Sequence, residues 1–438
     1  FGYDWVVIGG AKPFFERYFH LTDAAQSGWA NSCALVGCLL GAIAAGALSD
    51  KFGRKRLLLC SAFLFAATSL GNALAPTFTI FVTWRILGGL AIGLASNLSP
   101  MYIAEVAPAH LRGRLVSINQ LTIVVGILMA QFINWFLVRN LPAGSSEESI
   151  ANSWYGQQGW RWMFALTAAP SLLFVVGMLF VPESPRWLVK RGRSDLARGI
   201  LARISGEAYA NTEIGEVQKT LASEEIQHVR FKDLFDPRLR KVLVMGVVLA
   251  VFQQWCGINV IFNYAEEIFR AAGYDISDVL KNIAWTGSVN LVFTFVALGV
   301  VDRGGRRVLM LIGAAGLAVI YTAMGFCYHA GLKGLPMLLL VLSAIGCYAM
   351  SLAPVTWVVI SEIFPNRIRG AAMSVAVTSL WVACFILTYT FPLLNAHLGS
   401  AGTFWLYAGI CVAGLVFIAF RLPETKGKTL EQIEKELI

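Results

Sequence analysis

Two charged residues stand inside stretches of the sequence that are otherwise apolar. Asp4 lies within residues 1–8, and Arg85 lies within the run from 78 to 106. An isolated Asp or Arg at the centre of a membrane-spanning helix costs about 2.5–3.5 kcal/mol, so two such residues should pair or face water. Desolvation favours the neutral carboxylic acid, whereas a nearby guanidinium favours the carboxylate. Asp4 could therefore bind and release a proton, with Arg85 as its permanent counter-charge; a static ion pair is the alternative.

Three carboxamides occur within seven residues of another apolar run, at Gln253, Gln254 and Asn259. On one continuous helix, separations of five and six residues correspond to about 500° and 600°, which brings all three into a shared sector. An amide without a partner in hydrocarbon is costly. The three should therefore face a water-filled cavity or one another, and their donors and acceptors suit a neutral polyhydroxylated ligand. Contacts between packed helices are the alternative.

Five further residues are weaker candidates for binding such a ligand. Aromatic rings can pack against the C–H groups of a sugar, and polar side chains in or at the end of spans can bond to its hydroxyls. Anchoring at the membrane interface or packing in the core is the alternative for the rings. These candidates are Phe1, Gln120, Asn290, Trp357 and Trp381.

Charged residues also recur in short segments between the apolar runs. The segment Asp50-Lys51-Phe52-Gly53-Arg54-Lys55 returns at 302–307, at a spacing of 252 residues. Its basic residues could pair with carboxylates at helix ends on the same side of the membrane, in a layer that locks two halves of the protein together. Charge that sets only the orientation in the membrane is the alternative. The candidate gate residues are Asp50, Arg54, Glu105, Arg112, Glu183, Asp302, Arg306, Glu362, Arg369 and Glu424.

These candidate residues need membrane-spanning helices to position them. The chain is 57% hydrophobic and 14% charged, whereas soluble domains are about 25% charged. Apolar runs long enough to cross about 30 Å of hydrocarbon as helices recur along the sequence. We expect an all-α membrane protein of twelve helices, the first of which is truncated and ends in residues 1–8. The other spans are expected near 23–48, 57–75, 78–106, 114–138, 159–181, 242–270, 282–301, 308–330, 336–361, 370–393 and 402–421.

The two halves of the chain repeat each other. Glu105 recurs as Glu362 at a spacing of 257, and Asp4 is matched more faintly by Asn259 at a spacing of 255. Six-helix repeats with a site between them at mid-membrane are typical of secondary transporters. The expected units are an N-terminal six-helix half at 1–183, a helical linker at 184–237, a C-terminal six-helix half at 238–424 and a terminal helix at 425–438.

Positive charge is concentrated on one set of loops. Of the 35 Lys and Arg, 27 fall in alternate loops that include the linker, seven fall in the opposite loops, and Arg85 is within a span. The positive-inside rule places the first set, the linker and both termini in the cytoplasm. The net charge of +9 therefore indicates orientation in a plasma (inner) membrane and not nucleic-acid binding. The eight Cys and five His show no metal-ligand spacing, and we expect no metal, no cofactor and no enzyme activity.

Several motifs together resemble the sugar porters of the major facilitator superfamily, in particular the bacterial proton-coupled sugar symporters of the xylose type. They are residues 50–55 with their second copy, Arg112-Gly113, Pro182-Glu183-Ser184-Pro185-Arg186, the amides through Gly257-Ile258-Asn259, and Pro423-Glu424-Thr425-Lys426-Gly427. The resemblance implies that Asp4 is the protonatable carboxylate and Arg85 its partner. It also implies two sets of sugar-site residues. Those that contact the sugar are Gln120, Gln253, Gln254, Asn259, Asn290 and Trp357, and those that line the site are Phe1 and Trp381.

Four positions depart from the xylose-type pattern. Asn263 stands where that pattern has Tyr, Ala353 where it has Gly, and Leu380 and Ile127 where it has Gln. Because two pocket amides are lost, the resemblance leaves the identity of the sugar open.

We expect a proton-coupled symporter that imports a monosaccharide, a pentose or a hexose, by rocking of its two halves. A proton-independent facilitator in which Asp4 is structural, and a sugar receptor that does not transport, are the alternatives. The expected partners are a small neutral sugar, H⁺ and the lipid bilayer, with no nucleic acid. The protein is expected to function as a monomer.

Overall fold

The computed structural model describes residues 1–142, 147–226, 237–364, 369–426 and 432, and all regular elements in these ranges are helices. The first part of the chain forms α1 (Gly2–Tyr18), α2 (Ala24–Phe52), α3 (Arg54–Leu74), α4 (Phe78–Val106), α5 (Ala109–Val138), α6 (Glu147–Asn152), η1 (Tyr155–Gly159), α7 (Trp160–Ala165) and α8 (Ala168–Phe180). Three shorter helices follow, namely α9 (Pro185–Lys190), α10 (Ser194–Ser205) and α11 (Glu207–Ile226). The last part forms α12 (Pro237–Trp255), α13 (Ile258–Asn263), α14 (Ala265–Ala271), α15 (Ile276–Gly304), α16 (Arg306–His329), α17 (Leu335–Met350), α18 (Leu352–Ile363) and α19 (Arg369–Arg421).

The described chain forms twelve candidate membrane-crossing helices, called passages below. Ten helical stretches in it are long and apolar enough to cross a membrane. The last of them, Ala371–Arg421, holds two passages, because the backbone at Gly399 is not helical (φ 68°). The 17 residues of α1 add one more helix, about 26 Å long. The expected all-α membrane fold is confirmed, and each expected span lies mostly on helical residues.

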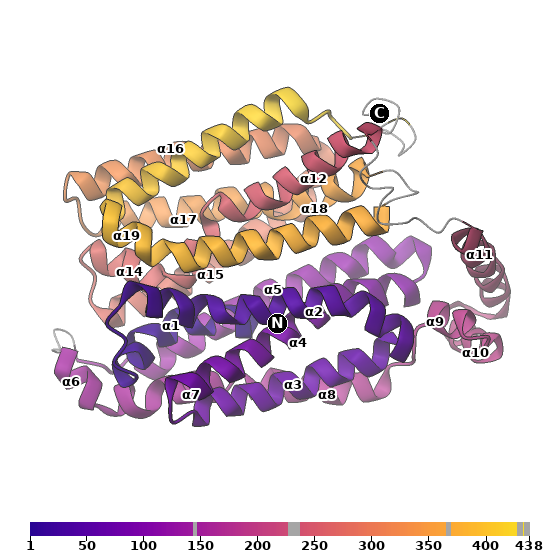
Figure 1. Cartoon of the computed structure of the whole chain (residues 1–438), viewed down its shortest axis with the longest axis horizontal. Helices are drawn as coiled ribbons and strands as arrows, with labels where there is room; N and C mark the ends of the chain where they lie inside the picture. The colour runs from indigo at the N-terminus through magenta and orange to yellow at the C-terminus, as the bar shows by residue number, and fades with distance from the viewer. Residues whose placement is uncertain (143–146, 227–236, 365–368, 427–431, 433–438) are drawn as a thin grey trace.

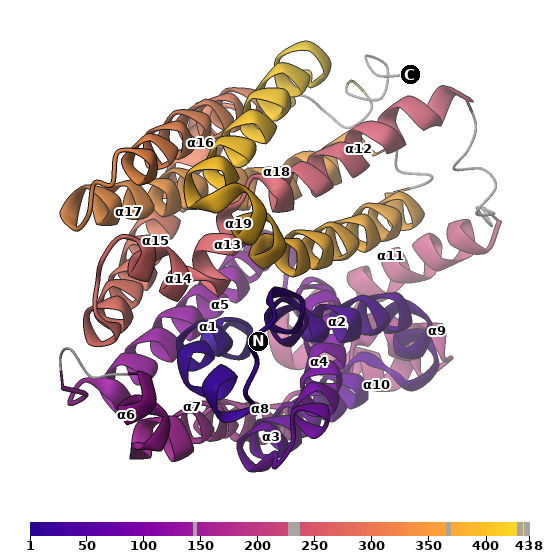
Figure 2. The same cartoon turned by 60° about the vertical axis from the view of Figure 1, so that its left-hand side comes forward.

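The passages form two groups that lie side by side (Figures 1 and 2). One group is α1–α8, drawn in indigo to magenta, and the other is α12–α19, drawn in pink to yellow. Across the boundary α2 packs against α19, α5 packs against α15, and α1 packs against α13 and α14. The approach of α1 to α13 requires a glycine, because a Cβ at Gly9 would lie 2.8 Å from the carbonyl oxygen of Phe262. The segments before and after α9–α11 thus meet along four pairs of elements.

α9, α10 and α11 form a small cluster at one end of the bundle, called the linker end below (Figure 1). Trp187, Leu188, Val189 and Ala197 are its buried core. Ser184 is the N-cap of α9, and its hydroxyl accepts a hydrogen bond from the N–H of Trp187 at 3.2 Å. The short helices expected between the two sets of spans are confirmed, and the helix expected near the C-terminus falls almost wholly outside the described residues.

One expected span, 242–270, is not a continuous helix. α12 and α13 are separated by a left-handed turn at Gly257 (φ 88°). A Cβ at this position would lie 3.1 Å from the ring of Tyr407 and 3.3 Å from that of Tyr321, so both the backbone and the space require glycine. The expectation of one continuous helix was wrong here, because a left-handed residue interrupts the i to i−4 hydrogen bonds. The expected span 336–361 is likewise divided into α17 and α18.

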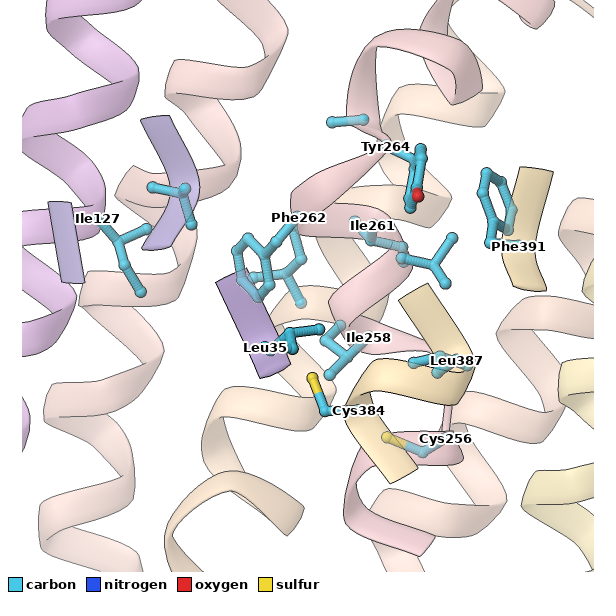
Figure 3. Close-up of a cluster of buried hydrophobic side chains, with 14 of the residues drawn as sticks. Leu35, Ile127, Cys256, Ile258, Ile261, Phe262, Tyr264, Cys384, Leu387 and Phe391 are labelled. Atoms are coloured by element: carbon cyan, nitrogen blue, oxygen red, sulfur yellow. The ribbon is translucent and has the colours of Figure 1, made fainter. Parts of the chain in front are cut away.

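α13 lies in an apolar cluster between the two groups (Figure 3). Its residues Ile258, Ile261 and Phe262 belong to the same buried core as Leu35 of α2 and Leu387 of α19. In a membrane protein such burial stabilises through close van der Waals packing, because lipid tails are as apolar as these side chains. Apolar contacts with both groups therefore position the short helix that carries Asn259.

Candidate functional site

Asp4 and Arg85 come together in the interior, as the sequence predicted. Asp4 is 4% exposed and Arg85 is 3% exposed. Arg85 Nη1 lies 3.8 Å from Asp4 Oδ1, which is an ion pair but is too long for a hydrogen bond. Asp4 Oδ2 and Arg85 Nε have no hydrogen-bond partner among the described residues. The carboxylate therefore keeps one oxygen available for a proton.

The surroundings of this pair are apolar or already bonded. The guanidinium of Arg85 lies 5.7 Å from the centroid of the Phe164 ring, a distance at which a cation and a ring face attract each other. Gly88, on the same helix as Arg85, leaves space beside the pair: a Cβ there would lie 3.7 Å from Asp4 Oδ2 and 3.3 Å from the hydroxyl of Thr68. That hydroxyl donates to the carbonyl of Phe65 at 3.2 Å. The charges are thus neutralised mainly by each other.

The three predicted carboxamides form one hydrogen-bonded chain. Gln253 Nε2 donates to the hydroxyl of Tyr348 at 2.7 Å, and Gln254 Nε2 donates to Gln253 Oε1 at 2.6 Å. Asn259 Nδ2 donates to Gln254 Oε1 and lies 3.8 Å from Cys384 Sγ. The turn at Gly257, and not a shared face of one helix, brings them together. The amides therefore meet as expected, but the expected shared face of one continuous helix is wrong.

The predicted aromatic residues differ in their contacts: Phe1 and Trp381 belong to one series of packed rings, whereas Trp357 is exposed. The ring of Trp381 on α19 lies 5.9 Å from that of Trp5, which lies 6.4 Å from the ring of Phe1. This edge-to-face series links α1 to the second group of helices. Trp357, on α18, is 40% exposed. Sequence reasoning missed Trp5, whose spacing of four from Phe1 was the available signal.

The remaining predicted polar residues are not hydrogen-bonded to the amide chain in the described structure. Asn290 is buried on α15, and Gln120 is exposed on α5. In the part of the chain that the structure describes, neither side chain makes a hydrogen bond with the amides. The structure thus joins Gln253, Gln254 and Asn259 directly, and it leaves Asn290, Gln120 and Trp357 as separate positions.

At the linker end, the first copy of the charged motif is a dense network. Arg54 Nε and Nη2 donate to the two carboxylate oxygens of Glu105 at 3.0 and 3.1 Å, and Nη1 donates to Asp50 at 3.1 Å. Glu183 Oε1 accepts the backbone N–H groups of Arg54 and Lys55 at 2.9 and 3.0 Å. Such bidentate Arg–carboxylate contacts fix geometry as well as charge. The network ties the ends of α2, α3, α4 and α8 together.

The second copy repeats this arrangement less tightly. Arg306 Nε lies 3.6 Å from Glu362 Oε1, and Glu424 accepts the backbone N–H groups of Arg306 and Arg307 at 2.8 and 3.2 Å. Burial alone would raise the pKa of Glu424, but the backbone N–H groups around it hold that pKa below its ordinary value.

The predicted charged layer does not bridge the two groups in the described residues. Every gate pair described above joins residues of the same group of helices. The side chains of Arg112, Asp302 and Arg369 are outside the described part of the structure.

Another buried charge, Lys12, is one of the seven basic residues expected in the opposite loops, and the structure instead places it within α1. Lys12 is 2% exposed. Its Nζ donates to the carboxylate of Glu267 on α14 and lies 3.5 Å from that of Glu16, which accepts the hydroxyl of Ser27 at 2.5 Å. The expectation failed because the helix α1 continues past Lys12 to Tyr18. This pair joins the two groups of helices at the end opposite the linker end.

Comparison with known proteins gives consistent matches over the whole chain. The model of the family described as "Sugar (and other) transporter" matches residues 1–437. The D-xylose-proton symporter of Escherichia coli is 38% identical, with 99% of this chain and 92% of that protein covered. The arabinose-proton symporter of Bacillus subtilis is also 38% identical, with 99% and 91% covered. The inward open conformation of the xylose transporter from E. coli matches the structure with a TM-score of 0.86 at 36% identity, over 100% of this chain and 96% of that one.

Proposed function

Because the chain belongs to the sugar porter family of the major facilitator superfamily, we propose that it imports a monosaccharide together with a proton by alternating access. Membership of this family makes it a sugar transporter and not an enzyme. The observation that carries the proton part of the proposal is the buried, loosely held pair of Asp4 and Arg85 at 3.8 Å.

Asp4 is the proton site in this mechanism. When Asp4 is protonated, Arg85 loses its counter-charge, and the protein favours the outward, sugar-loading state. After the change to the inward state, the proton leaves and the pair forms again. Each proton that moves inward supplies about 2.3 kcal/mol per 100 mV of membrane potential, which can drive sugar accumulation.

Gln253, Gln254 and Asn259 are the main sugar-binding residues in this mechanism. Gln254 bonds to Gln253 at 2.6 Å, and Gln253 bonds to Tyr348 at 2.7 Å. Asn259 bonds to Gln254. A sugar hydroxyl both donates and accepts, so it can replace one of these amide contacts without leaving a buried group unpaired. Asn290, Gln120, Trp357, Phe1 and Trp381 complete the proposed site as the chain rocks. The pentose symporters among the relatives favour a pentose, and a hexose is the second candidate.

The two groups of helices are the proposed rocking units, and they comprise residues 1–183 and 238–424. The proposed cytoplasmic segments are the linker at 184–237 and the terminal segment at 425–438. In this orientation, the contact of Lys12 with Glu267 joins the units on the outer side, and that of Trp5 with Trp381 joins them within the spans. The gate pairs of the linker end each stay within one unit. The lack of a described gate pair between the units at the linker end, together with the likeness to an inward open transporter, supports an inward-facing state.

The test is sugar-induced alkalinisation outside proteoliposomes that contain the purified protein. We expect wild-type protein to move protons with sugar and to accumulate sugar against its gradient. Asp4→Asn should keep sugar counterflow and lose both coupled proton movement and accumulation, whereas Asp278→Asn, at an exposed Asp on α15, should retain all three. Counterflow without proton movement in the wild type would favour the facilitator instead, and sugar binding without counterflow would favour the receptor.

A further inference from the structure

A cavity of about 630 Å³ opens at the linker end, away from Asp4 and the amides. It is bounded by the start of α3, by Pro182 and Glu183 just after α8, and by one face of α10. α8 ends an apolar membrane-spanning stretch at Phe180. The cavity therefore lies where the chain leaves the hydrocarbon, at the depth of lipid headgroups.

Four basic side chains line this cavity: Lys55, Arg56, Arg193 and Arg203. Of these, Lys55 Nζ donates to the carbonyl of Leu179 at 3.2 Å. Arg56, Arg193 and Arg203 have no ion pair among the described residues. Three arginines, from the start of α3 and from the two ends of α10, thus line one cavity, and none of them is paired with a carboxylate in the described structure.

Two carboxylates also line the cavity, and they compensate its positive charge only in part. Glu183 is committed to the backbone N–H groups of Arg54 and Lys55 at 2.9 and 3.0 Å and to that of Ser184 at 2.9 Å. Asp195 is exposed in the first turn of α10, where the helix N-terminus attracts negative charge. The lining therefore carries four positive and two negative side chains, and it should attract an anion.

The rest of the lining is apolar. Leu59, Leu196 and Ile200 form part of the wall, and Leu196 is 58% exposed. An exposed apolar surface beside arginines suits a molecule with an anionic head and a hydrocarbon part. Guanidinium groups bind phosphate oxygens through two parallel hydrogen bonds.

We propose that this cavity binds a phosphate group, carried either by a phospholipid of the cytoplasmic leaflet or by a soluble phosphate ester. The apolar wall favours the lipid. A bound headgroup would bridge α3 of the first group of helices to α10 of the linker. Binding at this place is independent of sugar transport, so it can be tested without any transport assay.

The experiment measures binding of four probes to the full chain in detergent by native mass spectrometry and thermal shift. The probes are phosphatidylglycerol, phosphatidylcholine, glycerol 3-phosphate and inorganic phosphate. The variants are Arg56→Gln and Arg203→Gln. The matched control is Arg198→Gln, which removes the same charge from α10 at a residue that is paired with Glu207 at 3.0 Å and is outside the cavity lining.

We expect the wild type to bind phosphatidylglycerol, each cavity variant to bind it about tenfold more weakly, and Arg198→Gln to bind it like the wild type. Binding of glycerol 3-phosphate or inorganic phosphate with the same variant dependence would support the phosphate site with a soluble source. Equal binding by all variants, or no binding of any phosphate probe, would overturn the proposal. A variant that fails to fold is recognised by its unfolding transition without added probe, and Arg193→Gln then replaces it.

Discussion

Asp4 and Arg85 are buried together but share no hydrogen bond. Their closest charged atoms are 3.8 Å apart, and Asp4 Oδ2 is unbonded within the described structure. A buried pair with tight bidentate bonds resists separation, because each lost partner leaves an uncompensated charge. The looser contact costs less to separate, which is what a carboxylate needs if it is to gain and lose a proton during each transport cycle.

The amide chain gives the first residue-level prediction. Gln254 both donates to Gln253 and accepts from Asn259, so Gln254→Ala breaks the chain at its middle. We expect the sugar concentration for half-maximal uptake to rise about three- to tenfold, as for the loss of one or two neutral hydrogen bonds. Uptake into proteoliposomes measures this. Gln218→Ala, at an exposed position on α11, is the matched control, and equal half-saturation in both variants would remove Gln254 from the site.

At the scale of elements, the division between α12 and α13 is the feature that shapes the site. It rests on one backbone conformation, at Gly257, and on the rings of Tyr321 and Tyr407 packed against it. Discontinuous helices expose backbone groups near the centre of the membrane and are typical of transporter binding sites. The amides stand on both sides of this turn.

Gly257→Ala should therefore destabilise the protein. A non-glycine residue with φ of 88°, combined with a Cβ against two rings, costs about 1–3 kcal/mol. We expect a lower thermal unfolding temperature in detergent, together with weaker sugar binding because the amides shift. Gly177→Ala on α8, where a Cβ would meet no atom within 4 Å, should leave stability unchanged or slightly raised. Similar unfolding temperatures for the two variants would contradict this account of the turn.

Glu424 gives an element-scale prediction that depends on pH. Its carboxylate accepts the first two N–H groups of α16, and its pKa is held below the ordinary value in the folded protein. A group whose pKa is lowered by folding contributes stability above its unfolded pKa and loses it as the pH falls through the folded pKa. We therefore expect the unfolding temperature of the wild type to fall at pH values below about 4.5.

Glu424→Gln should be less stable than the wild type at neutral pH by about 0.3–1 kcal/mol and should show a smaller loss on acidification. Thermal unfolding between pH 7 and pH 3 measures both effects. Glu148→Gln, at an exposed position on α6, provides the comparison. If Glu424→Gln follows the same pH curve as the wild type, the carboxylate does not hold α16 in this way.

At the scale of the whole molecule, the two groups of helices are joined differently at their two ends. Opposite the linker end, buried Lys12 of α1 bonds to Glu267 of α14, across the boundary between the groups. At the linker end, the described gate pairs stay within one group each. A rocking motion that opens the first end must therefore break the Lys12 contact, whereas the gate networks can move as rigid parts of their own group.

Lys12→Gln should loosen the contact between the two groups of helices at the end opposite the linker end. The lost bond to a charged partner is worth about 1.5–3 kcal/mol, so we expect faster hydrogen–deuterium exchange in α1 and α14 and a shift toward the outward state. The charge exchange Lys12→Glu with Glu267→Lys should restore slow exchange. Lys281→Gln, an exposed cation at the same end, should have no effect. If it increases exchange as much as Lys12→Gln does, the pair is not what holds this end closed.

The apolar periodicity of this chain was enough to predict its helices, because membrane crossing leaves backbone groups no partner except their own helix. Long apolar runs therefore gave the positions of the eleven spans, but not the interruptions that divide 242–270 and 336–361. Charged residues inside such runs identified Asp4 and Arg85 before any geometry was known, since only a partner or water makes them tolerable.

Tertiary contacts decided what these patterns left open. The end of α1 lies beyond Lys12 because Glu267, 255 residues away, neutralises that lysine, and no local pattern records so distant a partner. The left-handed turn at Gly257 is held by rings from α16 and α19, so the sequence of α12 and α13 alone reads as one helix. Asp4, Arg85 and the three amides could thus be named from residue type and burial cost, which are local properties. The distances between these residues, and whether their side chains are hydrogen-bonded, depend on packing between segments that are far apart in the chain.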